Sequence, residues 1–371
     1  MGTIEKCFPI DFSGIHKGMK HHVYTLLALL CIIYNSYAQS SSNFSFSEDE
    51  IVIKNNKATK SNLTVFKGEI SENNLSVSTP ILGKTIQGEK EIRFIPLIPF
   101  GWNQKYTVLF NGDIEYFSLP IPAGYEPLTV TNIYPSDSLV PSNILKWYVK
   151  FSKPINKVNS YSHISILTEK GDTLSRAILT LENVLISENG TLLTVWMEPG
   201  RQKRGLIPNQ QLGPVFKEKE TYRFMVSKEI KDMNGVSMNI GYKHKFQVTS
   251  EDRTKPSIKD WKINVPNVNS VSKLIIHTDE SLDYGSCIRN IIVFDSNQME
   301  IEGSWNIDDK ETVLSFTPLK PWKNDNYQIV FSEVIEDLAG NTLNRLFDQN
   351  MNNDLNPKFT PKRHKLDFNI K

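Results

Sequence analysis

One run of oxygen-bearing side chains has the spacing of a calcium-binding loop. In the segment DQNMNND, alternate positions carry side chains that can act as ligands, namely Asp348, Asn350, Asn352 and Asp354. Position six of that pattern is Asn353 where a glycine is usual, and position twelve is Phe359 where a bidentate glutamate is usual. The segment therefore predicts a solvated loop, with calcium as the alternative cofactor.

Other residue types that support catalysis are scattered. The histidines after residue 38 stand singly, and the sequence has no HExxH, GxSxG, GxxxxGK or GxGxxG motif. The acidic neighbours Asp279/Glu280 and Asp308/Asp309 would serve a glycosidase only if two carboxyl groups converged on one bond at roughly 5 to 9.5 Å. Surface turn acids are the simpler interpretation, so we predict no catalytic residue and no enzyme.

One insertion carries a basic cluster. The segment PGRQKRGLIPNQQLGPVF, residues 199–216, contains Arg201, Lys203 and Arg204 between glycines and prolines. This composition predicts a long exposed loop without its own secondary structure, and such loops often carry function. A solvated excursion and a partner-contact loop are equally compatible with the pattern.

Length and charge restrict the partners. The chain has 371 residues, enough for two or three domains, and 42 basic against 41 acidic side chains give a formal charge of +1. A nearly neutral chain has no field that favours nucleic acid, so nucleic acid is not an expected partner.

The beginning of the chain resembles a secretory signal. Residues 19–38 have a basic start, an apolar run too short to span a bilayer, and small residues before Ala38. We expect residues 1–38 to be a signal peptide, with Met19 a possible true start. A lipid anchor at Cys31 is disfavoured because the apolar run continues beyond it. Export to the periplasm, cell surface or medium follows, with no transmembrane segment in the mature chain.

Short runs rich in Val, Ile, Phe and Tyr recur between turn residues and predict an all-β fold. Internal repeats support this interpretation: FIPLIPFGWNQKYTVLF (94–110) matches FTPLKPWKNDNYQIVF (316–331), and ETYRFMVSKEIKDMNG (220–235) matches DNYQIVFSEVIEDLAG (325–340). The shared prolines predict a hairpin-like corner between two strands. The shared aromatics (Tyr106, Tyr222, Tyr327 and Trp322) predict a buried core.

Two aspartates predict turns. Asp232 and Asp337 each stand three residues before a glycine, a spacing in which the carboxylate accepts hydrogen bonds from backbone N–H groups of the turn.

Three patterns resemble the bacterial Ig-like domain of S-layer proteins, the SbsA type. They are the segment FSKPI (151–155), the aromatic-x-Pro-Leu-x-Pro pattern and the ending I-x-D-x-x-G-N-x-L (335–343). This resemblance implies tandem Ig-like β-sandwiches and a cell-envelope setting. Two triplets, Asp137-Ser138-Leu139 and Asp172-Thr173-Leu174, resemble O-glycosylation sites of Bacteroidetes-type secreted proteins, which is consistent with an exported surface protein. We expect about three domains: residues 39–120 (degenerate), 123–251 and 252–371.

The sequence thus predicts an exported non-enzymatic structural or interaction protein of a bacterial envelope, whose partner is an envelope protein or a polysaccharide. The alternatives are a carbohydrate-binding or carbohydrate-processing surface protein and an accessory subunit of a nutrient-uptake system. Exposed coplanar aromatics would favour carbohydrate, whereas the strand patterns predict that Trp147 and Trp196 are buried.

Overall fold

The computed structural model describes residues 43–54, 62–158, 160–348 and 363–371. The expected signal peptide, Cys31 and the ligand positions 350, 352 and 354 lie outside these residues. Within the described residues the fold is built from antiparallel sheets with a few short helices, so the predicted all-β class is confirmed. No helix of the described part is long and apolar enough to cross a membrane.

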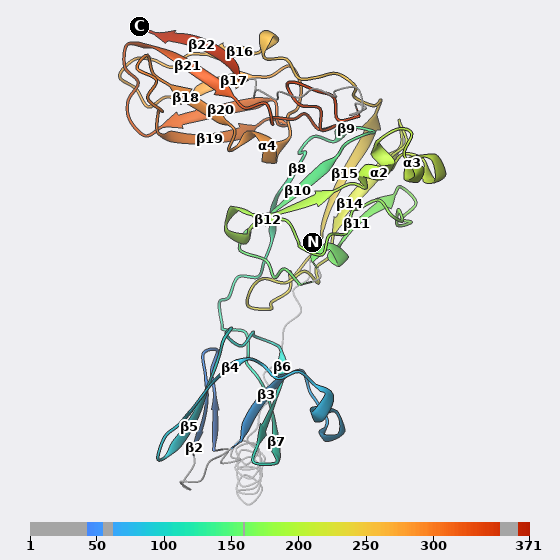
Figure 1. The fold of residues 1–371 in the computed structure, drawn as a ribbon, viewed down its shortest axis with the longest axis vertical. Helices are drawn as coiled ribbons and strands as arrows, with labels where there is room; N and C mark the ends of the chain where they lie inside the picture. Colours follow the sequence, from blue (N-terminus) through green and yellow to red (C-terminus); the bar gives the residue numbers. More distant parts are fainter. Residues whose placement is uncertain (1–42, 55–61, 159, 349–362) are drawn as a thin grey trace, which may run out of the picture. The chain divides into compact units, whose positions relative to one another are not determined.

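The described residues form two compact units. The first unit runs to Phe100 and includes Gln104–Leu119, and the second comprises Gly101–Asn103 and Pro120–Lys371. In the first unit one sheet has the order β1-β2-β5-β4 and the other the order β3-β6-β7 (Figure 1). Its elements are β1 (Phe44–Phe46), β2 (Ile51–Lys54), β3 (Leu63–Lys67), η1 (Glu72–Val77), β4 (Gly83–Gln87), β5 (Glu91–Pro96), β6 (Lys105–Phe110) and β7 (Asp113–Ser118).

The second unit contains two sandwiches. The first of these, here the middle sandwich, pairs the sheet β12-β13-β10-β8 with the sheet β11-β14-β15-β9. Its elements are β8 (Val130–Tyr134), β9 (Leu139–Pro141), β10 (Lys146–Phe151), η2 (Ser160–His163), β11 (Ile164–Thr168), β12 (Ile186–Ser187), η3 (Glu188–Gly190), β13 (Leu192–Trp196), α2 (Pro199–Gln202), α3 (Ile207–Leu212), β14 (Thr221–Val226) and β15 (Tyr242–Thr249).

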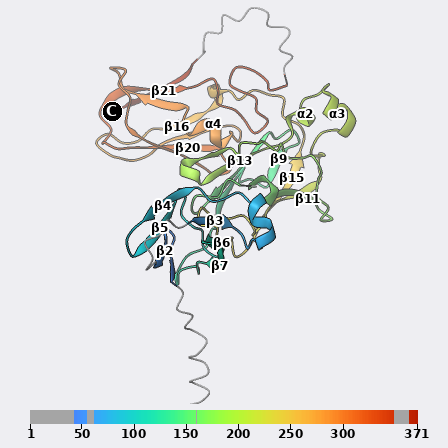
Figure 2. The same ribbon diagram turned by 60° about the horizontal axis from the view of Figure 1, so that its bottom comes forward.

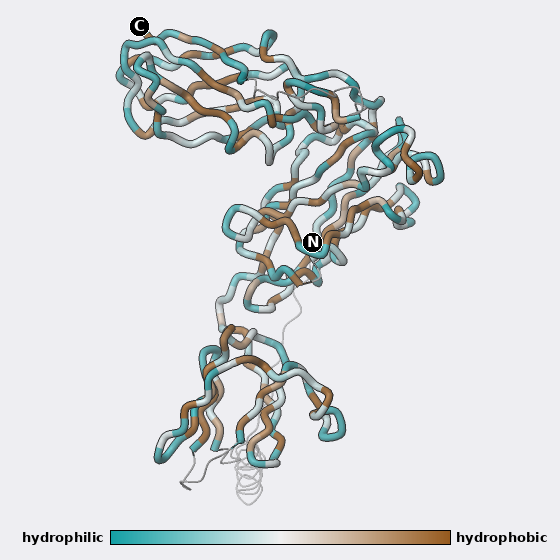
Figure 3. Tube along the Cα trace, viewed as in Figure 1, coloured by the Kyte–Doolittle hydropathy of each residue, from teal (hydrophilic) through white to brown (hydrophobic). Residues whose placement is uncertain are grey.

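The other, here the C-terminal sandwich, pairs the sheet β16-β17-β20-β19 with the sheet β18-β21-β22. Its elements are η4 (Ile258–Asp260), β16 (Lys262–Asn264), β17 (Leu274–His277), α4 (Tyr284–Cys287), β18 (Ile291–Phe294), β19 (Gly303–Asp308), β20 (Val313–Pro318), β21 (Asp325–Phe331) and β22 (His364–Ile370). Hydrophobic residues lie mainly along the strands and hydrophilic ones mainly in the connecting loops (Figure 3).

All three sandwiches use the strand order of immunoglobulin domains. In each, one sheet joins the first, second, fifth and fourth main strands, and the other joins the third, sixth and seventh, which is the ABED/CFG arrangement. The middle sandwich adds β9, which pairs parallel with its last strand β15. The predicted tandem Ig-like sandwiches are therefore confirmed.

The sequence repeat is a repeat of core packing. In every sandwich a tyrosine on the sixth strand lies opposite a phenylalanine on the seventh, in the pairs Tyr106–Phe117, Tyr222–Phe246 and Tyr327–Phe368. A third aromatic ring packs against each tyrosine: Phe100, Phe216 or Trp322, with centroids 4.9 to 5.2 Å away. Since these rings are buried, the predicted core role of the tyrosines is confirmed.

The tyrosine hydroxyls also close the corner before the sixth strand. The hydroxyl of Tyr327 accepts from the backbone N–H of Lys323 at 3.0 Å, and that of Tyr222 accepts from Lys217 at 3.2 Å. The corner is not the hairpin that the prolines suggested. Because β5 and β6, like β20 and β21, belong to different sheets, the chain crosses from one layer of the sandwich to the other at this point.

The two predicted Asp–Gly turns are present. One carboxylate oxygen of Asp232 accepts from the backbone N–H of Asn234 and Val236, and that of Asp337 accepts from Ala339 and Asn341. Gly235 and Gly340 have φ of 83° and 79°, a region that favours glycine.

At Gly83 and at Gly303, a neighbouring phenylalanine ring leaves no space for a larger side chain. An added Cβ would lie 2.5 Å from the Phe94 ring at Gly83 and 2.4 Å from the Phe316 ring at Gly303, and at each position a backbone carbonyl is equally close. We expect Gly303→Ala to lower the free energy of unfolding of the second unit by about 1 to 3 kcal/mol, because ring and strand must both shift. Urea unfolding followed by tryptophan fluorescence measures this. The matched control is Gly171→Ala, where a Cβ meets nothing within 4 Å but φ is positive; there only the cost of backbone strain, about 1 kcal/mol, is expected.

Candidate functional site

The insertion 199–216 folds into two short helices, contrary to the expectation of a loop without secondary structure. The helices α2 and α3 lie side by side at one end of the middle sandwich (Figures 1 and 2). Prolines stand in the first turn of each, where a missing N–H costs nothing, and the side chain of Glu198 caps α2 by accepting from the backbone N–H of Gly200.

Arg201 holds these helices together. Its guanidinium is buried and donates to the backbone carbonyls of Ser175, Arg176, Gly213 and Pro214 at 2.7 to 3.2 Å. Burial is the main cause that lowers the pKa of this guanidinium. Arg201 therefore stabilises the insertion itself.

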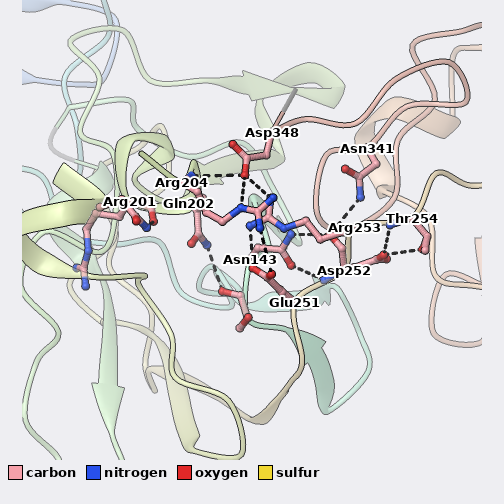
Figure 4. A network of polar contacts seen from close by, with 12 residues as sticks. Asn143, Arg201, Gln202, Arg204, Glu251, Asp252, Arg253, Thr254, Asn341 and Asp348 are labelled. Atoms are coloured by element: carbon pink, nitrogen blue, oxygen red, sulfur yellow. Dashed lines mark hydrogen bonds and ion pairs between the residues drawn. The ribbon is translucent and has the colours of Figure 1, made fainter. Parts of the chain in front are cut away.

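Lys203 and Arg204 contact the C-terminal sandwich. The ammonium of Lys203 lies 4.4 Å from the centroid of the Phe347 ring, and Arg204 Nε lies 3.0 Å from the carboxylate of Asp348. Arg253, in the polar linker between the two sandwiches (residues 249–256), binds the same carboxylate at 2.5 Å (Figure 4). The insertion thus bridges the junction between the two sandwiches of the second unit.

The backbone of the linker is bound from both sides. The amide side chain of Asn143 donates to the carbonyl of Asp252 at 2.7 Å and accepts from its N–H at 2.8 Å (Figure 4). Asn341 donates to the same carbonyl at 3.4 Å. Because residues of both sandwiches bind one linker residue, the linker is fixed.

A buried ionic network crosses the junction. Lys146 on β10 pairs with Glu336, and its ammonium lies 3.6 Å from Asp283; both acids belong to the C-terminal sandwich. The hydroxyl of Tyr148, also on β10, donates to Asp283 at 2.9 Å. Burial lowers the pKa of Lys146, but the charges of Asp283 and Glu336 outweigh burial and raise it. The lysine therefore stays charged.

Apolar contacts accompany this network. Tyr134 stacks on Tyr284 with centroids 3.7 Å apart and the rings inclined by 9°. Tyr148 and Leu192 of the middle sandwich belong to the hydrophobic cluster of the C-terminal one. The two sandwiches thus share part of a core.

Three carboxylates converge beside the linker. Asp252, Glu280 and Asp337 each place an oxygen within 4.8 Å of the others. Burial is the main cause that raises the pKa of Asp337 to about 7 and that of Glu280 to about 8, and the neighbouring carboxylates add to both shifts. Carboxylate oxygens are the ligands that hard cations such as Ca²⁺ prefer, so this cluster is the set of described residues best suited to hold a metal.

This cluster predicts a pH dependence of stability. Burial also raises the pKa of a third acid, Glu311, to about 7. Near neutral pH the folded state therefore binds protons at Glu280, Asp337 and Glu311 that the unfolded chain releases. The folded pKa values exceed the unfolded ones, so the stabilising protonation is complete below about pH 4 and is lost as the pH rises through 7 to 8. We expect the free energy of unfolding of the second unit to fall between pH 5 and pH 8.5 by about 1 kcal/mol or more.

Unfolding of the Glu280→Gln variant at both pH values checks the assignment. The variant should be more stable than the wild type at pH 8.5 and nearly equal to it at pH 5, whereas Glu229→Gln, at an exposed acid, should leave the profile unchanged. A pH slope identical in wild type and Glu280→Gln would contradict the role of Glu280.

The residues predicted from sequence separate in the structure. Arg201 is buried, while Lys203 and Arg204 lie at the junction, so the three do not form one surface. Asp348 is paired with two arginines, and calcium binding in its loop stays a prediction. Asp279 accepts from the indole N–H of Trp261, and Glu280 joins the carboxylate cluster.

The sequence patterns include some of the residues that join the sandwiches, but not the ionic network between them. Lys146, Asp283 and Glu336 are far apart in the chain, and no pattern in the sequence links them. Lys203 and Arg204 stand in the predicted basic cluster, Asp348 begins the calcium-like run, and Asp337 is a predicted turn residue. A basic residue in an otherwise apolar strand, Lys146 in LKWYVKF, was the one signal that a buried partner had to exist.

Comparisons with known proteins assign no family. No family model and no curated protein matches the chain. Among solved structures, a fragment of alpha-2-macroglobulin from Escherichia coli is similar at 12% identity and a TM-score of 0.22, and the match covers 56% of this chain and 66% of that one. The N-terminal part of the bacterial S-layer protein SbsC is similar at 12% identity and a TM-score of 0.23, and the match covers 66% of this chain and 44% of that one. The chicken CNTN1 FN1-FN3 domains are similar at 12% identity and a TM-score of 0.19, and that match covers 88% of this chain and 97% of the other. The chain spans less than half of the SbsC fragment, and these values are too low to assign a function.

Proposed function

We propose that the chain is an exported, non-enzymatic structural or interaction protein of a bacterial envelope, built from SbsA-like Ig modules. One observation carries the proposal. At the junction, residue types that elsewhere perform acid–base chemistry bind each other across two sandwiches, as Lys146 does with Asp283 and Glu336. These groups hold two modules in a fixed geometry, which is what a spacer or scaffold needs.

The insertion is the proposed partner-contact segment. Its exposed apolar side chains include Ile207, 67% exposed, and Leu212, 44% exposed. Exposed apolar side chains suit binding to a protein partner. Deleting residues 201–211 would remove the buried Arg201 and Gln202, so surface substitutions are the sharper test.

The experiment is crosslinking of living cells, followed by purification of the tagged protein and mass spectrometry of bound proteins and glycans. We expect the protein in an envelope or secreted fraction, with one stoichiometric protein partner whose recovery falls in the double variant Ile207→Asp/Leu212→Asp. The control is Ile240→Asp, at a residue 81% exposed elsewhere on the middle sandwich. Retention in the cytosol would contradict export, and equal recovery with both variants would contradict the contact segment.

A further inference from the structure

A pocket of about 370 Å³ opens between the two sandwiches of the second unit. One wall is the outward face of the sheet containing β10 and β13, with Lys146, Thr194 and Trp196. The opposite wall comes from the C-terminal sandwich, from Asp283 to Asn290. The volume lies within the range typical of small-molecule sites.

The pocket contains both engaged and free polar groups. Lys146 and Asp283 form an ion pair in the pocket wall, with 3.6 Å between the ammonium and the carboxylate. The hydroxyls of Ser187 and Thr194 and the guanidinium of Arg289 line the same pocket and have no side-chain partner in the described part of the chain. A ligand would therefore find donors and acceptors already positioned, without displacing an ion pair.

An aromatic ring stands among these groups. Trp196 was expected to be buried like Trp147, but it is only half-buried and lines the pocket. The Lys146 ammonium lies 4.9 Å from the centroid of the indole, within the range of a cation–π contact. Charges at the pocket balance, since Lys146 and Arg289 face Asp283 and Glu188, so a neutral ligand is favoured over an ion.

We propose that this pocket binds a neutral pyranose sugar. A pyranose has an apolar C–H face that packs on an indole and a rim of hydroxyls that hydrogen-bond to hydroxyl, amide and guanidinium groups. Trp196 supplies the packing surface, and Ser187, Thr194 and Arg289 supply the hydrogen bonds. This function is additional to the scaffold role and does not depend on it.

The test is saturation-transfer NMR on the full chain, with glucose, galactose, mannose and N-acetylglucosamine as probes. We expect saturable binding of at least one sugar at concentrations up to about 20 mM. Trp196→Ala should weaken it by about tenfold or more, and Thr194→Val, which keeps the shape and removes the hydroxyl, by about fivefold.

The matched control is Trp305→Ala, at a half-buried tryptophan on β19 outside the pocket, which should bind as the wild type does. Unfolding curves establish that each variant is folded. If the folded wild type transfers saturation to none of the four sugars, the proposal is wrong. It is also wrong if both Trp196→Ala and Thr194→Val bind with unchanged affinity, because the sugar would then occupy another site.

Discussion

Replacing Lys146 by methionine is expected to lower the free energy of unfolding of the second unit by about 3 to 5 kcal/mol. The side chain of Lys146 is 10% exposed and neutralises Asp283 and Glu336 together. Removing one member of a buried ionic network leaves its partners charged in a medium that solvates them poorly. Methionine keeps the length of the side chain, so the loss reports charge more than volume. Urea unfolding at pH 7.5, followed by tryptophan fluorescence, measures the effect.

Two further variants separate this explanation from a general loss of packing. Glu336→Gln in the Lys146→Met background should recover part of the loss, because one unneutralised charge is then gone. Lys245→Met, at an exposed lysine whose ammonium lies 3.9 Å from Glu169, should change stability by only a few tenths of a kcal/mol. Equal effects of Lys146→Met and Lys245→Met would show that the network does not stabilise the junction.

The fold was predictable because its signals are local and repeated. Short apolar runs indicate many of the strands, and the motif that leads into Tyr106 and Tyr327 marks the crossing between sheets in two sandwiches. The sequence pattern does not predict that glycine is needed at positions 83 and 303, because this need arises only when the ring of Phe94 or Phe316 on the adjacent strand lies against the glycine. The hairpin expectation failed for a related reason: prolines mark the end of a strand, but they do not specify the sheet of the next one.

The site was less predictable because its contacts join distant parts of the chain. Tyr148 and Asp283 meet across 135 residues, and neither carries a pattern that anticipates the other. Trp196 illustrates the same limit. Its strand pattern indicates one face turned to the core of its own sandwich, but only the neighbouring sandwich decides whether the opposite face meets solvent, protein or a pocket.

The second large effect on stability is expected for a substitution of Arg201 in the insertion. We expect Arg201→Met to lower the free energy of unfolding by about 2 to 4 kcal/mol, because the backbone carbonyls of Ser175, Gly213 and Pro214 lose a charged donor. Arg201→Lys should recover only part of this loss, since one ammonium cannot reproduce the planar fork that reaches carbonyls on both sides.

Arg204→Met is the matched control in the same insertion. The side chain of Arg204 is 65% exposed, so its loss should affect the contact with Asp348 and leave the helices folded. Limited proteolysis distinguishes the two roles: Arg201→Met should open residues 199–216 to cleavage, whereas Arg204→Met should be cut no faster than the wild type. If Arg201→Met resisted cleavage as the wild type does, the guanidinium would not be what holds α2 to α3.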